Sequence, residues 1–126
     1  MTKEELIDRN RKFVIEVFRL MEVLPNNRMY DGLVRQWVRS SSSIGANYRA
    51  TCRAKSTADF INKLKIVEEE ADETSYWLDL LESMDSGINK EKIKGLLKES
   101  NELVSIYSAS LITIRNKATG SKNRIS

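Results

Sequence analysis

Apolar residues recur at helical spacing along almost the whole chain and divide it into four segments. In the first segment they fall three, four and seven residues apart, at Leu6, Phe13, Val17, Leu20 and Leu24. Thr2 followed by Glu5 is the pattern of a capping box, which predicts where this helix begins. Pro25, the only proline, is followed by Asn26 and Asn27 and ends the helix.

The second helix is predicted from about Arg28 to Ala54, with its inward positions at Leu33, Trp37, Ile44 and Tyr48. Ser56, with Asp59 three residues later, is a second N-terminal signal and begins a third helix that runs to about Met84. The apolar positions of the third helix follow a seven-residue pattern, at Phe60, Leu64, Val67, Ala71, Thr74, Leu78 and Leu81.

The composition of residues 85–87 predicts a turn, after which Asn89 can cap a fourth helix that reaches about Lys117. The pattern therefore predicts an all-α protein. Residues 1–117 form one four-helix domain in this prediction, and the polar segment 118–126 is a disordered tail.

The stretch from Leu103 to Ile114 contains no charged residue on any face of the predicted helix. A helix without a charged face is normally buried nearly all round, whereas a monomeric four-helix bundle leaves one face of each helix in water. We therefore expect an oligomer interface here, formed by Leu103, Ile106, Tyr107, Leu111 and Ile114.

Basic residues gather on one side of the second helix. At about 100° per residue, five arginines fall within an arc of roughly 80°, opposite the inward positions. We call them the arginine stripe: Arg28, Arg35, Arg39, Arg49 and Arg53. Such a surface of one charge sign is typical of binding to an anion or to an acidic protein face.

The third helix has the opposite charge, and its acidic run from Glu68 to Glu73 leaves several interpretations open. Carboxylates four residues apart share a face, so the run can be a solvated acidic surface or a metal site. Alternatively, Glu70 and Glu73 lie on one stripe with Ile66 and Trp77. From there they can pair with arginines of the second helix, in the same or in a neighbouring subunit.

Composition limits the chemistry. The chain has 126 residues, 40% of them apolar, and a net charge of only +3, so it fits one globular domain whose charge matters by its distribution. It contains no histidine, which excludes Ser-His-Asp and Cys-His nucleophilic systems as well as histidine general bases. We expect no enzymatic activity, no cofactor and no metal.

The single cysteine, Cys52, favours a reducing compartment and is expected to be a buried structural thiol. The N-terminal residues do not resemble a signal peptide, and no apolar run reaches the length of a membrane span. These features predict a cytoplasmic protein without a membrane partner. The small residues Ser41 and Gly45 are expected to allow close packing of another helix, which we prefer to a serine nucleophile.

The middle of the chain resembles a known family. An R-S-x-x-S-I-x-x-N element begins at Arg39 and ends at Asn47, and an S-x-x-[DE]-F element follows from Ser56 to Phe60. Together they resemble the four helix bundle proteins, also called 23S rRNA intervening sequence proteins. This family is related to the accessory variability determinant proteins of diversity-generating retroelements.

The resemblance implies an antiparallel, up-and-down four-helix bundle that assembles as a ring-like homopentamer with a basic surface and without known enzymatic activity. It also implies RNA, DNA or a partner protein such as a reverse transcriptase as binding partners. The first hypothesis is therefore a homo-oligomer that binds nucleic acid through the phosphate contacts of the arginine stripe. The alternative is a protein-interaction scaffold whose arginines pair with acidic helices of neighbouring subunits or of a partner.

Overall fold

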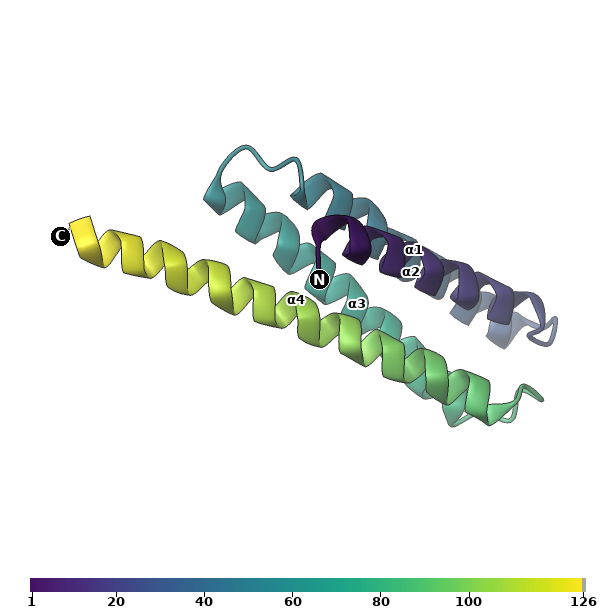
Figure 1. Ribbon diagram of the computed structural model, residues 1–126. Helices are drawn as coiled ribbons and strands as arrows, with labels where there is room; N and C mark the ends of the chain where they lie inside the picture. The colour runs from purple at the N-terminus through teal and green to yellow at the C-terminus, as the bar shows by residue number, and fades with distance from the viewer. Residues whose placement is uncertain (126) are drawn as a thin grey trace.

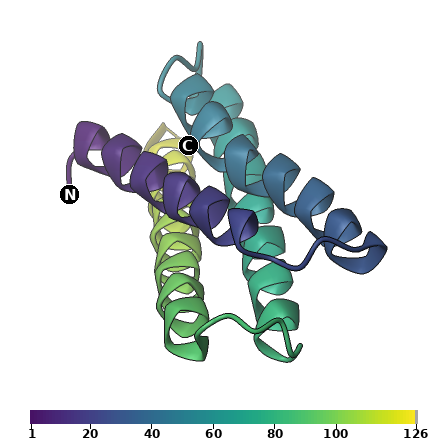
Figure 2. The same ribbon diagram turned by 90° about the vertical axis from the view of Figure 1, so that its right-hand side faces the viewer.

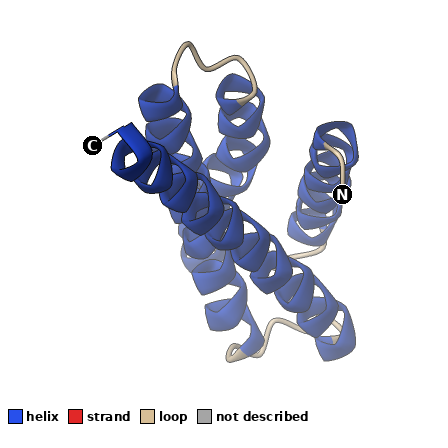
Figure 3. Cartoon of the chain, turned by 60° about the vertical axis from the view of Figure 1, so that its left-hand side comes forward, coloured by secondary structure: helices blue, strands red, loops and turns tan. Residues whose placement is uncertain are grey.

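The computed structural model describes residues 1–125, with side chains for residues 1–119, and it contains four helices. Their bounds are α1 (Lys3–Glu22), α2 (Arg28–Thr51), α3 (Thr57–Glu82) and α4 (Lys90–Ile125). Figure 3 shows the helices joined by short connections. No strand occurs within the described residues, so the predicted all-α fold is confirmed.

The helix starts follow local capping interactions. In the capping box of α1, the Glu5 N–H donates to Thr2 Oγ1 and the Thr2 N–H donates to Glu5 Oε2, each over 3.1 Å. Ser56 caps α3 by accepting the Asp59 N–H. Asn27 caps α2 by accepting the Tyr30 N–H at its side-chain oxygen over 3.0 Å, a role that the sequence analysis missed. Such caps satisfy N–H groups that have no partner inside the helix.

The four helices pack around one core, and α3 lies between α2 and α4. The contacts of α3 with these two helices are the most extensive in the molecule, while α1 packs against α2 and α4. Figure 2 shows α3 and α4 side by side and α1 inclined to both. The inward positions predicted by periodicity are largely confirmed, and the largest fully buried side chains include Trp37, Tyr107, Leu20, Ile44, Leu64 and Leu78.

The α2–α3 contact is built from small and hydroxyl side chains. Ser40, Ala71 and Thr74 are each 0% exposed, and the Thr74 hydroxyl donates to Ser40 Oγ over 2.9 Å. The Ser41 hydroxyl, also buried, donates to the Trp37 carbonyl oxygen over 2.6 Å. Because these side chains are short, the two helices pack closely here, and the hydrogen bonds satisfy the buried hydroxyl groups.

The last helix is longer than predicted. The sequence places a disordered tail at residues 118–126, whereas α4 continues to Ile125, and Ser126 lies outside the described residues. Residues 118–125 contain no proline, and the single Gly120 costs a helix only about 1 kcal/mol, so nothing local stops the helix at Lys117. In Figure 1 the C-terminal part of α4 extends past the ends of the other helices.

No helix in the described part of the chain has a stretch that is long and apolar enough to cross a membrane.

Candidate functional site

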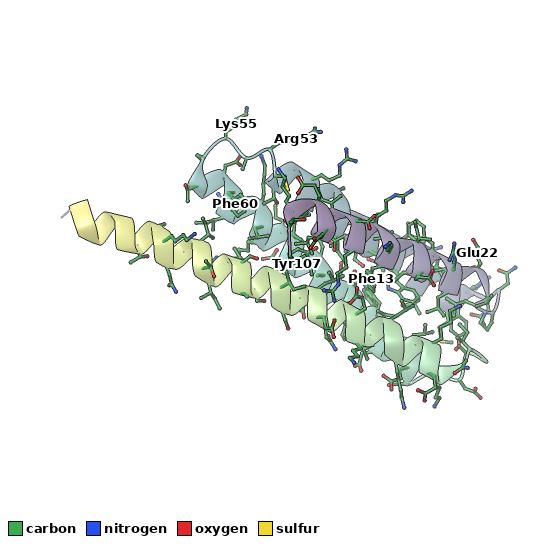
Figure 4. The ribbon with its side chains drawn as sticks, viewed as in Figure 1. Phe13, Glu22, Arg53, Lys55, Phe60 and Tyr107 are labelled. Carbon is green, nitrogen blue, oxygen red and sulfur yellow. The ribbon has the colours of Figure 1, made fainter. Side chains whose placement is uncertain are left out.

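All members of the arginine stripe are exposed. Four of them lie on α2, on the side opposite its buried residues. Arg53 lies just beyond the end of α2, in the connection to α3, because the helix ends at Thr51 and not near Ala54 as predicted. Figure 4 shows Arg53 and Lys55 on this connection, with side chains directed away from the bundle.

Arg39 differs from the other arginines of the stripe because it forms ion pairs within the chain. Its guanidinium donates to the Glu73 carboxylate and to both carboxylate oxygens of Glu70, at 3.2 and 3.3 Å. The hydrogen bond to Glu73 and the charge of Glu70 raise the pKa of Arg39. The structure therefore selects one interpretation of the acidic run, in which Glu70 and Glu73 pair with the second helix inside the same subunit.

The other arginines of the stripe remain available. Among the described residues, none of Arg28, Arg35, Arg49 and Arg53 forms an ion pair. Their charges therefore face solvent on α2 and on the connection that follows it. The stripe thus has two parts, a neutralised position at Arg39 beside α3 and four uncompensated positions.

The rest of the acidic run has local roles. Glu68 accepts a hydrogen bond of 2.5 Å from the Ser108 hydroxyl and so connects α3 to α4, while Glu69 and Asp72 are exposed. Within residues 1–119, no group of three or more histidine, cysteine, aspartate or glutamate residues is arranged to hold a metal ion.

The predicted oligomer-interface residues divide into two groups. Leu103 and Tyr107 are 0% exposed and Leu111 is 2% exposed, so these three belong to the core of the chain itself. Ile106 and Ile114 are half-buried. Burial within one subunit explains these three positions, because α4 packs against both α3 and α1. Four other positions of the stretch are exposed, at Ser105, Ala109, Ile112 and Thr113. Ile112, which the prediction did not name, is 60% exposed.

A groove between α1 and α2, which sequence reasoning missed, lies beside the stripe. We call it the α1–α2 groove, and its volume is about 440 Å³. Its wall on α1 includes Ile7, Val14, Ile15 and Phe18, and its wall on α2 includes Ser42, Gly45 and Ala46, with Arg11 and Arg49 also among its lining residues. A Cβ atom at Gly45 would meet nothing within 4 Å, so the expected close approach of another helix at this residue does not occur within the chain.

Asn10 also lines this groove and is 1% exposed. Its Oδ1 accepts a 2.5 Å hydrogen bond from the Tyr107 hydroxyl of α4, but its Nδ2 has no partner among the described residues. Burial raises the pKa of Tyr107, and burial also raises the pKa of nearby Tyr48 to about 12, so both phenols stay neutral and can donate at physiological pH.

Cys52 is only half-buried, not buried as predicted. It lines a shallow depression together with Phe60 and Ile114, at the end of the bundle where α2 stops.

Comparison with known proteins agrees with this architecture. The family model described as "23S rRNA-intervening sequence protein" matches residues 2–109. A solved crystal structure from Bacteroides thetaiotaomicron VPI-5482, described as a protein of unknown function from the S23 ribosomal protein family, is 35% identical, with a TM-score of 0.76. The match covers 84% of this chain and 97% of that one. No curated protein sequence matches the chain. The chain belongs to the 23S rRNA-intervening sequence protein family.

Proposed function

We propose that this protein is a non-enzymatic, homo-oligomeric helical bundle that binds RNA or DNA through phosphate contacts. The contacting residues are Arg28, Arg35, Arg49 and Arg53. The observation that carries the proposal is that all four side chains are exposed, three of them on one side of α2, and that none has an ion-pair partner among the described residues. Guanidinium groups bind phosphate with paired hydrogen bonds, so such a surface suits a nucleic-acid backbone.

The dimensions of the stripe fit an extended polyanion. Arg28 and Arg49 are separated by 21 positions of one helix, which corresponds to roughly 30 Å at a rise of 1.5 Å per residue. A nucleic-acid strand that follows this line passes several phosphates. Arginines that contact only phosphates position a backbone without reading bases, so this part of the binding is weakly selective for sequence.

Arg39 contributes less than its neighbours in this proposal. Glu70 and Glu73 already hold its guanidinium, and their negative charges repel a phosphate that approaches from the α3 side. The surface that binds nucleic acid therefore faces away from α3.

For the assembly, we propose antiparallel up-and-down bundles that form a ring-like homopentamer. The short connections between consecutive helices support the antiparallel order. Exposed apolar side chains offer surface for contacts between copies, at Ile66, Tyr76 and Ile112 and at the half-buried Ile106 and Ile114. Light scattering on the purified protein is expected to give a mass near five times 14.5 kDa; a monomer at all concentrations would contradict this assembly.

One observation favours a second candidate, the protein-interaction scaffold. Arg39 already engages two carboxylates of an acidic helix, and an acidic helix of another protein can bind the remaining arginines in the same manner.

Salt dependence tests the first candidate. The logarithm of the affinity for RNA or DNA is expected to fall linearly with the logarithm of salt concentration, with a slope that reports the number of phosphate contacts. Arg35→Gln removes an unpaired arginine and is expected to weaken binding and to make the slope shallower by about one unit. Arg39→Gln is the matched control, because its arginine is occupied, and it is expected to change the slope far less.

Two outcomes contradict the proposal. Undetectable binding at about 50 mM salt, where phosphate contacts are strong, excludes the nucleic-acid function. Loss of the oligomer in Arg35→Gln, seen by light scattering, places the stripe in a contact between subunits and supports the scaffold.

A further inference from the structure

The α1–α2 groove has the properties of a ligand site rather than of a surface irregularity. Its volume of about 440 Å³ lies within the range of small-ligand pockets, and most of its lining is apolar. Phe18 lines it with 38% of its surface exposed, which is unusual for a large aromatic side chain that could be buried. Gly45 and Ala46 have no large side chains, so a flat group can approach the backbone of α2 at these positions.

The groove and the arginine stripe share one side of α2. Around the helix, Ser42, Ala46 and Arg49 lie within about 40° of the direction of Arg35. Arg49 belongs to both features, and Arg11 of α1 is the second cation of the groove. Neither arginine forms an ion pair among the described residues. A strand whose phosphates contact the stripe therefore passes beside an apolar groove that carries two available positive charges.

Asn10 adds a polar group that lacks a partner. Its Oδ1 is fixed by the Tyr107 hydroxyl, while its buried Nδ2 donates to nothing among the described residues. Because this nitrogen is closed off from solvent, a ligand in the groove reaches it only if the Asn10 side chain moves. The apolar lining and the two arginines therefore suit a flat, largely apolar group that is attached to an anion.

We propose that the α1–α2 groove binds an unpaired nucleobase of the strand whose phosphates contact the arginine stripe. The proposal rests on the proposed function and adds to it a preference for single-stranded over duplex nucleic acid. The base stacks on Phe18, and the adjoining phosphates contact Arg11 and Arg49. Bases in a duplex are stacked on their neighbours and cannot enter, whereas unpaired bases are commonly bound on aromatic side chains.

Filling the groove tests this assignment without changing any charge. Gly45→Leu places a side chain in the groove, and the free space around Gly45 means that its Cβ meets no neighbour. Gly45→Ala is the matched control, because it makes the same backbone change and leaves most of the volume open. The probe is a short fluorescein-labelled RNA of mixed sequence, either single-stranded or annealed to its complement, followed by fluorescence anisotropy on the full chain.

Gly45→Leu is expected to weaken single-stranded binding by roughly tenfold, the contribution of one stacked base, and to leave duplex binding unchanged. Gly45→Ala is expected to bind both probes like the parent protein. Phe18→Ala provides a second test that does not depend on tolerance at Gly45, and it is expected to weaken only single-stranded binding, by several-fold.

Each alternative result has a distinct meaning. If Gly45→Leu and Phe18→Ala bind the single strand like the parent while Arg35→Gln binds it weakly, the base site is excluded and the proposed function stands. If Arg35→Gln also binds normally, the proposed function itself fails. If Gly45→Leu changes the mass measured by light scattering, the groove is a contact between copies of the chain, and the base site is again excluded.

Discussion

Helix α2 has two neighbours, and its contacts with them differ in kind. Towards α3 it presents Ser40, which is fully buried and receives a hydrogen bond from Thr74, and Arg39, which is held by Glu70 and Glu73. Towards α1 it presents Gly45, around which there is open space, and Arg49, which has no ion-pair partner among the described residues. The side of α2 that faces α3 is thus fully packed and paired, whereas the side that faces α1 has open space and an arginine that can bind a ligand.

This difference defines the proposed binding surface more narrowly than the charge pattern does. A helical wheel does not distinguish the five arginines of the stripe from one another. In the folded chain, Glu70 and Glu73 of α3 neutralise Arg39, whereas the other four arginines have no ion-pair partner among the described residues. The surface that remains is the one bordered by the α1–α2 groove. Three experiments test how firmly the contacts of each region hold the fold.

The largest expected effect is in the core beneath α2. Trp37 is 0% exposed, and Trp37→Ala is expected to lower the free energy of unfolding by about 3–5 kcal/mol, because it removes a large apolar contact and leaves a cavity. Phe18→Ala, on the α1 side, is expected to cost less than half as much, since Phe18 is already 38% exposed. Urea denaturation of both variants measures the difference, and equal losses would mean that the α1 side is packed as tightly as the core.

A smaller effect is expected where α1 is held by α4. Tyr107→Phe removes the hydroxyl that donates to Asn10 Oδ1 and leaves that buried oxygen without a donor. The expected loss of unfolding free energy is about 1–3 kcal/mol. Tyr76→Phe is the control, because Tyr76 is 54% exposed and its hydroxyl has no hydrogen bond among the described residues. Unchanged stability in Tyr107→Phe would show that the Asn10–Tyr107 pair does not hold α1.

The smallest effect concerns the turn between α2 and α3 and depends on pH. The hydrogen bond from the Lys63 ammonium, with a second from the Lys55 N–H, lowers the pKa of Asp59. A lowered pKa in the folded state means that the ionised carboxylate stabilises the fold at neutral pH. This contribution disappears as the pH falls below about 4 and through the lowered pKa.

Asp59→Asn is therefore expected to lower the melting temperature at pH 7, and the gap from the parent protein is expected to be smaller at pH 3. Circular dichroism at the two pH values measures it. A gap of constant size would contradict the assignment of the stabilisation to the ionised carboxylate.

Local signals made most of the fold predictable. The capping box of Thr2 and Glu5, the cap at Ser56 and the helical spacing of apolar residues depend only on neighbours in sequence, and each has its expected place. The length of α4 was underestimated because a polar segment without proline carries no stop signal. The core positions Leu103, Tyr107 and Leu111 were assigned to an oligomer because a charge-free helix does not reveal which of its faces the same chain covers.

The candidate site was predictable only in part. A helical wheel gives the direction of Arg39 but not the identity of its neighbours, so its pairing with Glu70 and Glu73 could be offered only as one alternative. The α1–α2 groove has no linear signature, because its existence depends on the separation of two helices at Gly45. Asn10 could have drawn attention as a polar residue within the apolar repeat of the first helix, between Leu6 and Phe13.

The contacts that hold α1 against α4 also set an order of events during synthesis. Arg9 donates hydrogen bonds to Glu99 and Glu102, and the Tyr107 hydroxyl donates to Asn10, so these contacts join residues 90 to 97 positions apart. At about 5–20 residues per second, the ribosome needs roughly 5–20 s after making Asn10 to supply these partners. During that interval α4 has not yet been made, so the apolar side of α1 can pack only against α2 or bind a chaperone. Of the four helices, α1 therefore waits longest for its complete set of contacts.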